Sequence, residues 1–181
     1  TGPDGTFAAL QPDNLRFFLP GPFNRSLPLH GLITGRLLGV AVATGPEDPD
    51  AVFLPPGAVS PCGFEADEAL LPWPARSLPA YRWLTEYFSF PDRFLFFQVS
   101  GLTARAVKGA GAEMDLYLYL SETDRDLERS VDATSFALGA TPVVNLFPQT
   151  ADPFRLSGSQ LEYRVVPDSR YARRLTASTP M

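Results

Sequence analysis

The sequence predicts an α+β fold, with an antiparallel, β-rich sheet and a few short helices packed on it. Three observations lead to this prediction. The 181 residues include 19 prolines and 14 glycines, which divide the chain into short elements. Several apolar runs are too short for helices, and some alternate with polar residues as half-buried strands do. Hydrophobic residues make up 45% of the chain, which is enough to form a packed core.

The length fits a single domain over residues 1–181, and a subdivision is expected near 103–112. The chain begins with Thr1 where a complete protein would begin with methionine. We therefore expect it to be an internal fragment of a longer protein.

The first elements are expected to be a loop over 1–14 and a short strand over 15–19. The apolar positions that follow recur at helical spacing, which predicts a helix that begins near Asn24 or Ser26 and ends before Gly45. These positions are Leu29, Leu32, Ile33, Leu37 and Val40.

Three glycines, Gly31, Gly35 and Gly39, are four residues apart within this predicted helix. They would lie on one narrow face, and we expect that face to pack closely against a neighbouring backbone. A short strand is predicted at 52–54. The stretch 57–76 shows no period and is expected to be a long ordered loop, of the kind that often forms functional or interface surfaces.

A second helix is predicted over 77–88. It has two apolar faces, so we expect it to be buried on two sides or to meet a partner. The first face is made by Tyr81, Leu84 and Phe88, and the second by Trp83 and Tyr87.

Residues 94–99 are apolar except for Gln98, which predicts a central strand covered on both faces. Residues 114–120 alternate and predict a half-buried strand, which we expect to pair antiparallel with 94–99. A short helix is predicted over 124–131, and further short strands at 136–138, 154–156 and 161–166.

Charge and residue counts exclude several functional classes. The net charge is −5, so no basic face is expected for nucleic acid. One cysteine, Cys62, cannot form an internal disulfide, and with one histidine, His30, no zinc site is expected. We predict no catalytic residue, metal or cofactor. The longest apolar run near the start, 37–43, is too short to cross a bilayer, so no direct membrane insertion is expected.

Two other functional interpretations remain open on residue chemistry alone. One is a carbohydrate- or peptide-binding β-rich module in which Trp73, Tyr81 and Trp83 stack on the ligand. The other is an enzyme, which would need two convergent carboxylates with perturbed pKa values. A concave pocket lined by the aromatic rings would favour the first interpretation.

Three segments resemble one protein family. They are Gly63–Pro74, Tyr81–Phe97 and Phe136–Pro148, the last followed by Glu162–Asp168. In order and spacing they resemble the TssF family (ImpG, VasA) of the bacterial type VI secretion system, and the resemblance extends over most of the chain. Position 140, often cysteine in that family, is Ala140 here, which weighs against a redox or metal role at this position.

The resemblance implies a structural, non-catalytic role as part of a wedge subunit of the cytoplasmic baseplate, which supports assembly of the contractile sheath. The partners that it implies are TssG, TssE, TssK, the VgrG spike and further TssF copies. Large apolar residues in an irregular loop, and two residues of the third segment, are our candidates for a partner interface. They are Leu70, Leu71, Trp73, Asn145 and Phe147.

Overall fold

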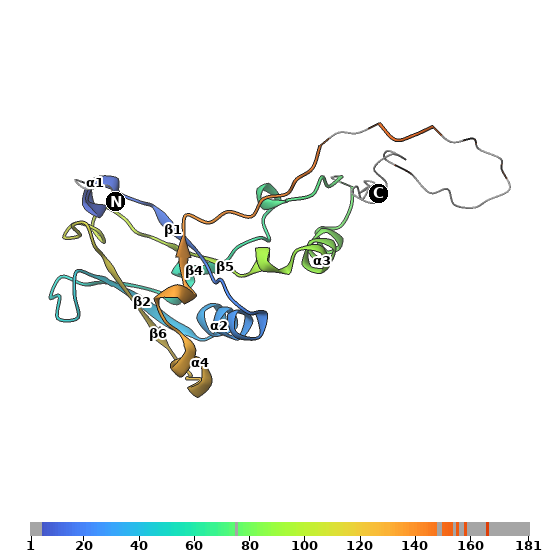
Figure 1. The fold of residues 1–181 in the computed structure, drawn as a ribbon. Helices are drawn as coiled ribbons and strands as arrows, with labels where there is room; N and C mark the ends of the chain where they lie inside the picture. The colour runs from blue at the N-terminus through green and yellow to red at the C-terminus, as the bar shows by residue number, and fades with distance from the viewer. Residues whose placement is uncertain are drawn as a thin grey trace.

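The computed structural model describes residues 5–74, 76–147, 150–153, 155, 158 and 166. It has two antiparallel sheets and a few short helices, which confirms the predicted α+β class (Figure 1). The helices are α1 (Phe7–Leu10), α2 (Phe23–Gly35), α3 (Pro79–Ser89) and α4 (Arg125–Ser130), with single 3-10 turns η1 (Pro56–Ala58), η2 (Ala66–Glu68), η3 (Pro91–Phe94) and η4 (Ala133–Ser135). The strands are β1 (Asn14–Phe18), β2 (Leu37–Ala43), β3 (Val52–Leu54), β4 (Val59–Pro61), β5 (Phe96–Ser100), β6 (Asp115–Leu120) and β7 (Ala137–Leu138).

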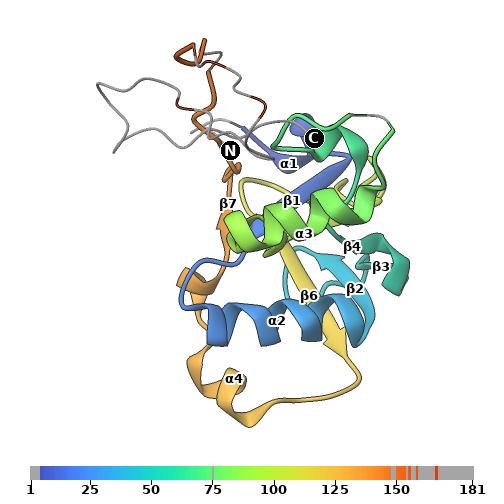
Figure 2. The ribbon, with the colours of Figure 1, turned by 90° about the vertical axis from the view of Figure 1, so that its right-hand side faces the viewer.

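The strands form one sheet of order β4-β5-β1-β7 and a second of order β3-β2-β6. β5 lies between two neighbours, so the prediction of a central strand at 94–99 is confirmed. Its register sets Phe17 of β1 opposite Phe97, and the two rings stack with centroids 5.2 Å apart. Helix α2 contacts strands of both sheets (Figure 2), and the apolar core fills the space that they share.

The helix predicted from Asn24 or Ser26 to Gly45 is wrong in its second half. α2 ends at Gly35, where the N–H of Arg36 donates to the carbonyl of Leu32 at 3.0 Å. The following residues form β2, which pairs with β3 on one side and β6 on the other. A strand in the middle of a sheet is apolar at most positions, so its residues can match helical spacing by coincidence.

The glycine face predicted on that helix is also wrong. Gly31 and Gly35 are exposed, and a Cβ atom on either would meet no atom within 4 Å. Gly39 is instead in β2, where a Cβ would lie 2.1 Å from the ring of Phe53 and 2.8 Å from the carbonyl oxygen of Leu54. Of the three glycines, only Gly39 packs closely against a neighbouring backbone, and it does so within a sheet and not on a helix.

The pairing predicted for the strand at 114–120 is wrong as well. β6 pairs with β2 in the second sheet, whereas β5 pairs with β1 and β4 in the first. The stretch that joins β5 to β6 contributes Leu102, Val107 and Ala110 to the core. The subdivision near 103–112 stays a prediction.

The remaining predictions are mixed. The stretch 57–76 is less irregular than expected, because it contains β4 and η2. The short helix predicted over 124–131 is confirmed as α4, and the strand at 136–138 as β7. The strands predicted at 154–156 and 161–166 lie outside the described residues, apart from position 166.

Candidate partner interface

Helix α3 has its charged side chains inside and most of its large apolar side chains outside. Arg82 and Glu86, four residues apart, are 4% and 2% exposed, whereas Phe88 is 81% exposed. We call the exposed apolar set the α3 outer face; it comprises Leu78, Tyr81, Leu84, Tyr87 and Phe88. The described residues leave the first predicted apolar face, that of Tyr81, Leu84 and Phe88, uncovered, and its contact with a partner stays a prediction. On the second face, Trp83 is half-buried and its ring packs against Phe64.

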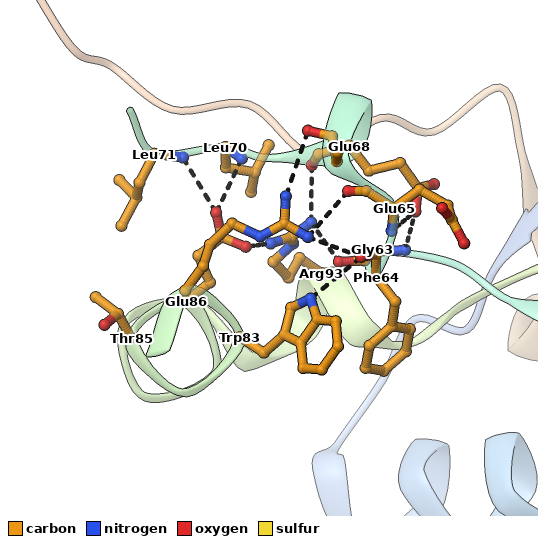
Figure 3. A network of polar contacts seen from close by, with 12 residues as sticks. Gly63, Phe64, Glu65, Glu68, Leu70, Leu71, Trp83, Thr85, Glu86 and Arg93 are labelled. Atoms are coloured by element: carbon orange, nitrogen blue, oxygen red, sulfur yellow. Dashed lines mark hydrogen bonds and ion pairs between the residues drawn. The ribbon is translucent and has the colours of Figure 1, made fainter. Parts of the chain in front are cut away.

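The inward charges of α3 hold the loop at residues 63–71, which we call the clamped loop. Glu86 forms an ion pair with Arg93 of η3, whose exposed fraction is 2%. Glu86 Oε1 also accepts hydrogen bonds from the backbone N–H groups of Leu70 at 3.0 Å and Leu71 at 3.1 Å (Figure 3). One carboxylate therefore compensates a buried guanidinium and satisfies two backbone donors.

Both buried arginines bind carbonyl groups of the same loop. Arg82 donates to three successive carbonyls, those of residues 64–66, at 2.8 to 3.3 Å. Arg93 donates to the carbonyls of Gly63 at 2.9 Å and Glu68 at 2.8 Å. A loop without long strands or helices thus satisfies its backbone acceptors with two cationic side chains from neighbouring elements.

Glu68 closes the clamped loop and ties it to the first sheet. Its Oε2 accepts from the N–H groups of Gly63 at 2.6 Å and Glu65 at 3.3 Å, and its Oε1 pairs with Arg16 of β1 at 2.5 Å. Gly63 has a φ of 101°, a conformation that side-chain-bearing residues rarely adopt. The tight turn at this position therefore requires glycine.

The cost of burying the charges of Arg82, Glu86 and Arg93 indicates that these side chains hold the clamped loop in position. Burial lowers the pKa of Arg93, and the nearby charge of Arg82 lowers it further. The ordinary pKa of an arginine is so high that the guanidinium still stays charged at neutral pH. Removing one partner of a buried ion pair typically costs about 3–5 kcal/mol, because the other charge is left uncompensated. Each of these charges therefore helps to fix one loop conformation.

An aromatic cluster covers one side of the clamped loop. The ring of Phe64 meets Trp83 edge-on, with centroids 5.7 Å apart, and meets Phe94 at 5.2 Å. Trp83 Nε1–H donates to the carbonyl of Phe64 at 3.1 Å. The indole of Trp83 thus forms its hydrogen bond and a ring contact with Phe64 of the same chain.

Two of the predicted interface residues line a pocket. Leu70 and Leu71 are half-buried and line, together with Val143 and Val144, a pocket of about 210 Å³. Its other lining residues come from the C-terminal end of α3 and the residue after it, and we call it the apolar pocket. They are Glu86, Ser89 and Phe90.

The other predicted interface residues lie outside this pocket. Trp73 is half-buried, and its Nε1–H donates to the carbonyl of Ser77 at 3.4 Å. Asn145 and Phe147 are exposed and belong to the segment 139–147 that follows β7. That Leu70, Leu71, Trp73, Asn145 and Phe147 contact a partner stays a prediction.

The aromatic residues of the alternative interpretation are not gathered around one cavity. A second, more polar pocket of about 300 Å³ lies beside the clamped loop, between Arg16, Glu68 and Thr141. Neither this pocket nor the apolar pocket is lined by Trp73, Tyr81 or Trp83. The concave aromatic site that would favour a carbohydrate- or peptide-binding module is therefore not formed at either place.

Sequence reasoning missed the buried cluster of Arg82, Glu86 and Arg93. A signal for it was present, because Arg82 and Glu86 have the i, i+4 spacing of an ion pair on one helix face. The same spacing is common on solvated helix faces, however, and charged residues are seldom fully buried. Only the tertiary fold shows that this face points inward.

His30 and Cys62 are both buried. The carbonyl of Phe96 can only accept, so His30 Nε2–H donates to it, at 3.1 Å, and burial lowers the pKa of the imidazole. Cys62 is a buried free thiol whose pKa burial raises. Among the described residues, no group of three or more His, Cys, Asp or Glu side chains could hold a metal ion. No described helix combines the length and apolar character needed to cross a membrane.

Comparison with known proteins identifies relatives over most of the chain. Residues 1–177 match the family model described as "Type VI secretion system, TssF". The type VI secretion system component TssF1 of Pseudomonas aeruginosa is 34% identical over 162 residues, which is 90% of this chain and 26% of that protein. The chain thus spans about a quarter of the length of this relative.

A solved structure has a similar fold. It is a chain in the cryo-electron microscopy structure of the TssK-TssF-TssG baseplate subcomplex, with a TM-score of 0.57 and 25% sequence identity. The match covers 88% of this chain and 30% of the solved one. Taken with the family model that spans nearly the whole sequence, these similarities show that the chain belongs to the TssF family of the type VI secretion system.

Proposed function

We propose that this chain is part of a structural subunit of the type VI secretion baseplate, which assembles with TssG and TssK in the cytoplasm. The observation that carries the proposal is the match to the TssF family over residues 1–177. The similar solved chain comes from a complex that contains TssK and TssG, and this supports the choice of partners. TssE, the VgrG spike and further TssF copies complete the proposed set of contacts, which support assembly of the sheath.

The surface of the chain supports an assembly role. Helix α3 and Leu78, the residue before it, together expose five large apolar side chains, and the helix exposes no charged one, because its two charges are buried. Several large apolar side chains exposed along one helix are typical of protein–protein contact. The buried side chains beneath it are bonded to one another and to backbone groups, so they stabilise a surface and are poorly placed for chemistry. We therefore propose that the chain has no catalytic activity.

The test is co-purification of the full-length subunit that carries this sequence with TssG and with TssK, each tested separately. Leu84→Asp places a charge in the α3 outer face, where Leu84 is 55% exposed. We expect this variant to fold normally and to lose about 2 kcal/mol or more of binding to one partner, as interface anchors do.

Leu27→Asp is the matched control. Leu27 is 43% exposed on α2, a different helix, so the same chemical change is made at another exposed leucine. If the unmodified subunit binds neither TssG nor TssK, the proposed function is wrong. If both variants bind as the unmodified subunit does, the α3 outer face is not the contact.

A further inference from the structure

We propose that residues 139–147, which we call the arm, are a docking strand. An extended, uncharged segment of another baseplate protein pairs with the backbone of the arm and inserts one large apolar side chain into the apolar pocket. This inference rests on the proposed function, because it specifies how a baseplate partner is held.

The first observation is the unpaired backbone of the arm. β7 pairs with β1 only at Ala137 and Leu138, and the chain then leaves the sheet as an extended trace (Figure 1). Within the described part of the chain, no main-chain hydrogen bond involves residues 140–147. Free N–H and C=O groups on an extended segment are a template for an added strand.

The second observation is the character of the arm's side chains. Four large apolar residues are exposed between Pro142 and the proline at position 148. They are Val143, Val144, Leu146 and Phe147. Because neither proline has a backbone N–H, residues 143–147 form an uninterrupted run of five donors between them, and we expect pairing there. This length matches a typical strand.

The third observation is the absence of charge, which selects the occupant. No charged residue occurs between Asp132 and Asp152, although charged residues make up 19% of the chain. Strands that remain open to solvent usually carry charges that prevent pairing, and this one carries none. A charged partner strand would bury its charge without compensation, so an uncharged segment fits. A lipid surface fits poorly, because it would leave the backbone donors unpaired.

The fourth observation is the apolar pocket beside the arm. Val143 and Val144 of the arm line it, together with a wall made by Leu70 and Leu71 of the clamped loop. Its volume of about 210 Å³ is below the range of small-molecule sites, but it suits one leucine- or phenylalanine-sized side chain. Glu86 holds the N–H groups of Leu70 and Leu71, so the wall is fixed before a partner arrives. Backbone pairing next to a side-chain pocket is the arrangement of strand-addition sites.

Amide hydrogen exchange tests the backbone part of the proposal. It is measured on the full-length subunit, alone at several concentrations and after assembly with purified TssG and TssK. We expect amides within 143–147 to exchange about tenfold more slowly, or slower still, after assembly. Unchanged exchange in an assembled complex would overturn the docking strand and leave the proposed function intact. Protection already present in the isolated subunit would also overturn it: concentration-independent protection indicates cover by the same chain, and concentration-dependent protection indicates a second copy.

Ser89→Trp tests the pocket part. Ser89 is exposed at the rim of the apolar pocket, so a tryptophan there fills the pocket without disturbing the core. Ala104→Trp is the control, since Ala104 is exposed and lines neither pocket described above. We expect Ser89→Trp to weaken partner binding about tenfold or more and to remove the protection of 143–147, with Ala104→Trp unchanged. Equal behaviour of the two variants would overturn the pocket as an anchor site.

Discussion

Glu86 of α3 has three tasks at once in holding the clamped loop in place. It compensates the charge of Arg93 and accepts from the backbone N–H groups of Leu70 and Leu71. The first task needs a negative charge, whereas the other two need only an acceptor oxygen. Substitutions can therefore separate the contributions of charge and hydrogen bonding.

Glu86→Ala removes both contributions, and we expect it to lower the free energy of unfolding by about 3–5 kcal/mol. Glu86→Gln keeps an acceptor oxygen and should destabilise less. The amides of Leu70 and Leu71 should exchange faster in the alanine variant than in the glutamine variant. Denaturant unfolding and hydrogen exchange on the same samples measure both effects.

Glu122→Ala is the control for this prediction. Glu122 pairs with Arg36 at 3.1 Å, but both side chains are more than half exposed. Exposed pairs contribute about 0–1 kcal/mol, so little change is expected. Equal losses for Glu86→Ala and Glu122→Ala would show that the buried cluster does not stabilise the fold.

His30 should make stability depend on pH in a defined window. Burial lowers its pKa in the folded chain below the ordinary value of 6.5, so the unfolded chain binds a proton first as the pH falls. Stability should therefore decrease as the pH falls through about 6.5 and level off below the folded pKa.

His30→Gln keeps a donor for the carbonyl of Phe96 but cannot titrate. Its unfolding midpoint should depend less on pH than that of the unmodified chain between about pH 7.5 and 5.5. Asp48 and Asp132 do not interfere in this window, because backbone and side-chain hydrogen bonds lower their pKa values below the ordinary 3.8. Parallel profiles for the two chains would contradict this role of His30.

At the scale of elements, local signals in the sequence identified several short elements and missed others, among them α1, β2 and β4. β1, β3, α3 and α4 follow from short apolar or capped patterns, and they occur within one or two residues of the predicted positions. β2 was missed because its apolar residues continue the spacing of α2. These residues form a strand because they pair with β3 and β6. Such long-range pairing produces no periodic pattern in the sequence of the strand itself.

The glycines of this region give a prediction at the same scale. Gly39→Ala puts a methyl group against the Phe53 ring and the Leu54 carbonyl, and we expect a loss of about 1–3 kcal/mol. Gly31→Ala adds a methyl group in open space within α2, and we expect a gain of about 0.5–1 kcal/mol from helix propensity. Urea unfolding of both variants measures the difference. A loss of stability in Gly31→Ala would contradict the open surroundings of that position.

At the scale of the whole molecule, the sequence indicated the class of fold and the family but not the arrangement of the surfaces. The pairing of β6 with β2, rather than with β5, depends on which sheet each strand joins, and alternation alone cannot specify this. Likewise, the apolar stripe of α3 was visible in the sequence. That this stripe faces outward depends on the hydrogen bonds that Arg82 and Glu86, on the other side of the helix, form with the clamped loop. The apolar character of Leu70 and Leu71 made them interface candidates in the sequence. Val143 and Val144, which line the same pocket, were not among those candidates.

The pairing of β1 with β5 also has a consequence for synthesis. Asn14 is opposite Ser100, so the ribosome must add more than eighty residues after β1 before its partner strand exists. At ordinary translation rates this takes roughly 4–17 s. During that interval Phe17 and Phe18 lack the rings of β5 on which they stack in the finished fold. We therefore expect the nascent chain to expose an unpaired aromatic strand for seconds, and such transiently exposed apolar strands are the surfaces that chaperones bind.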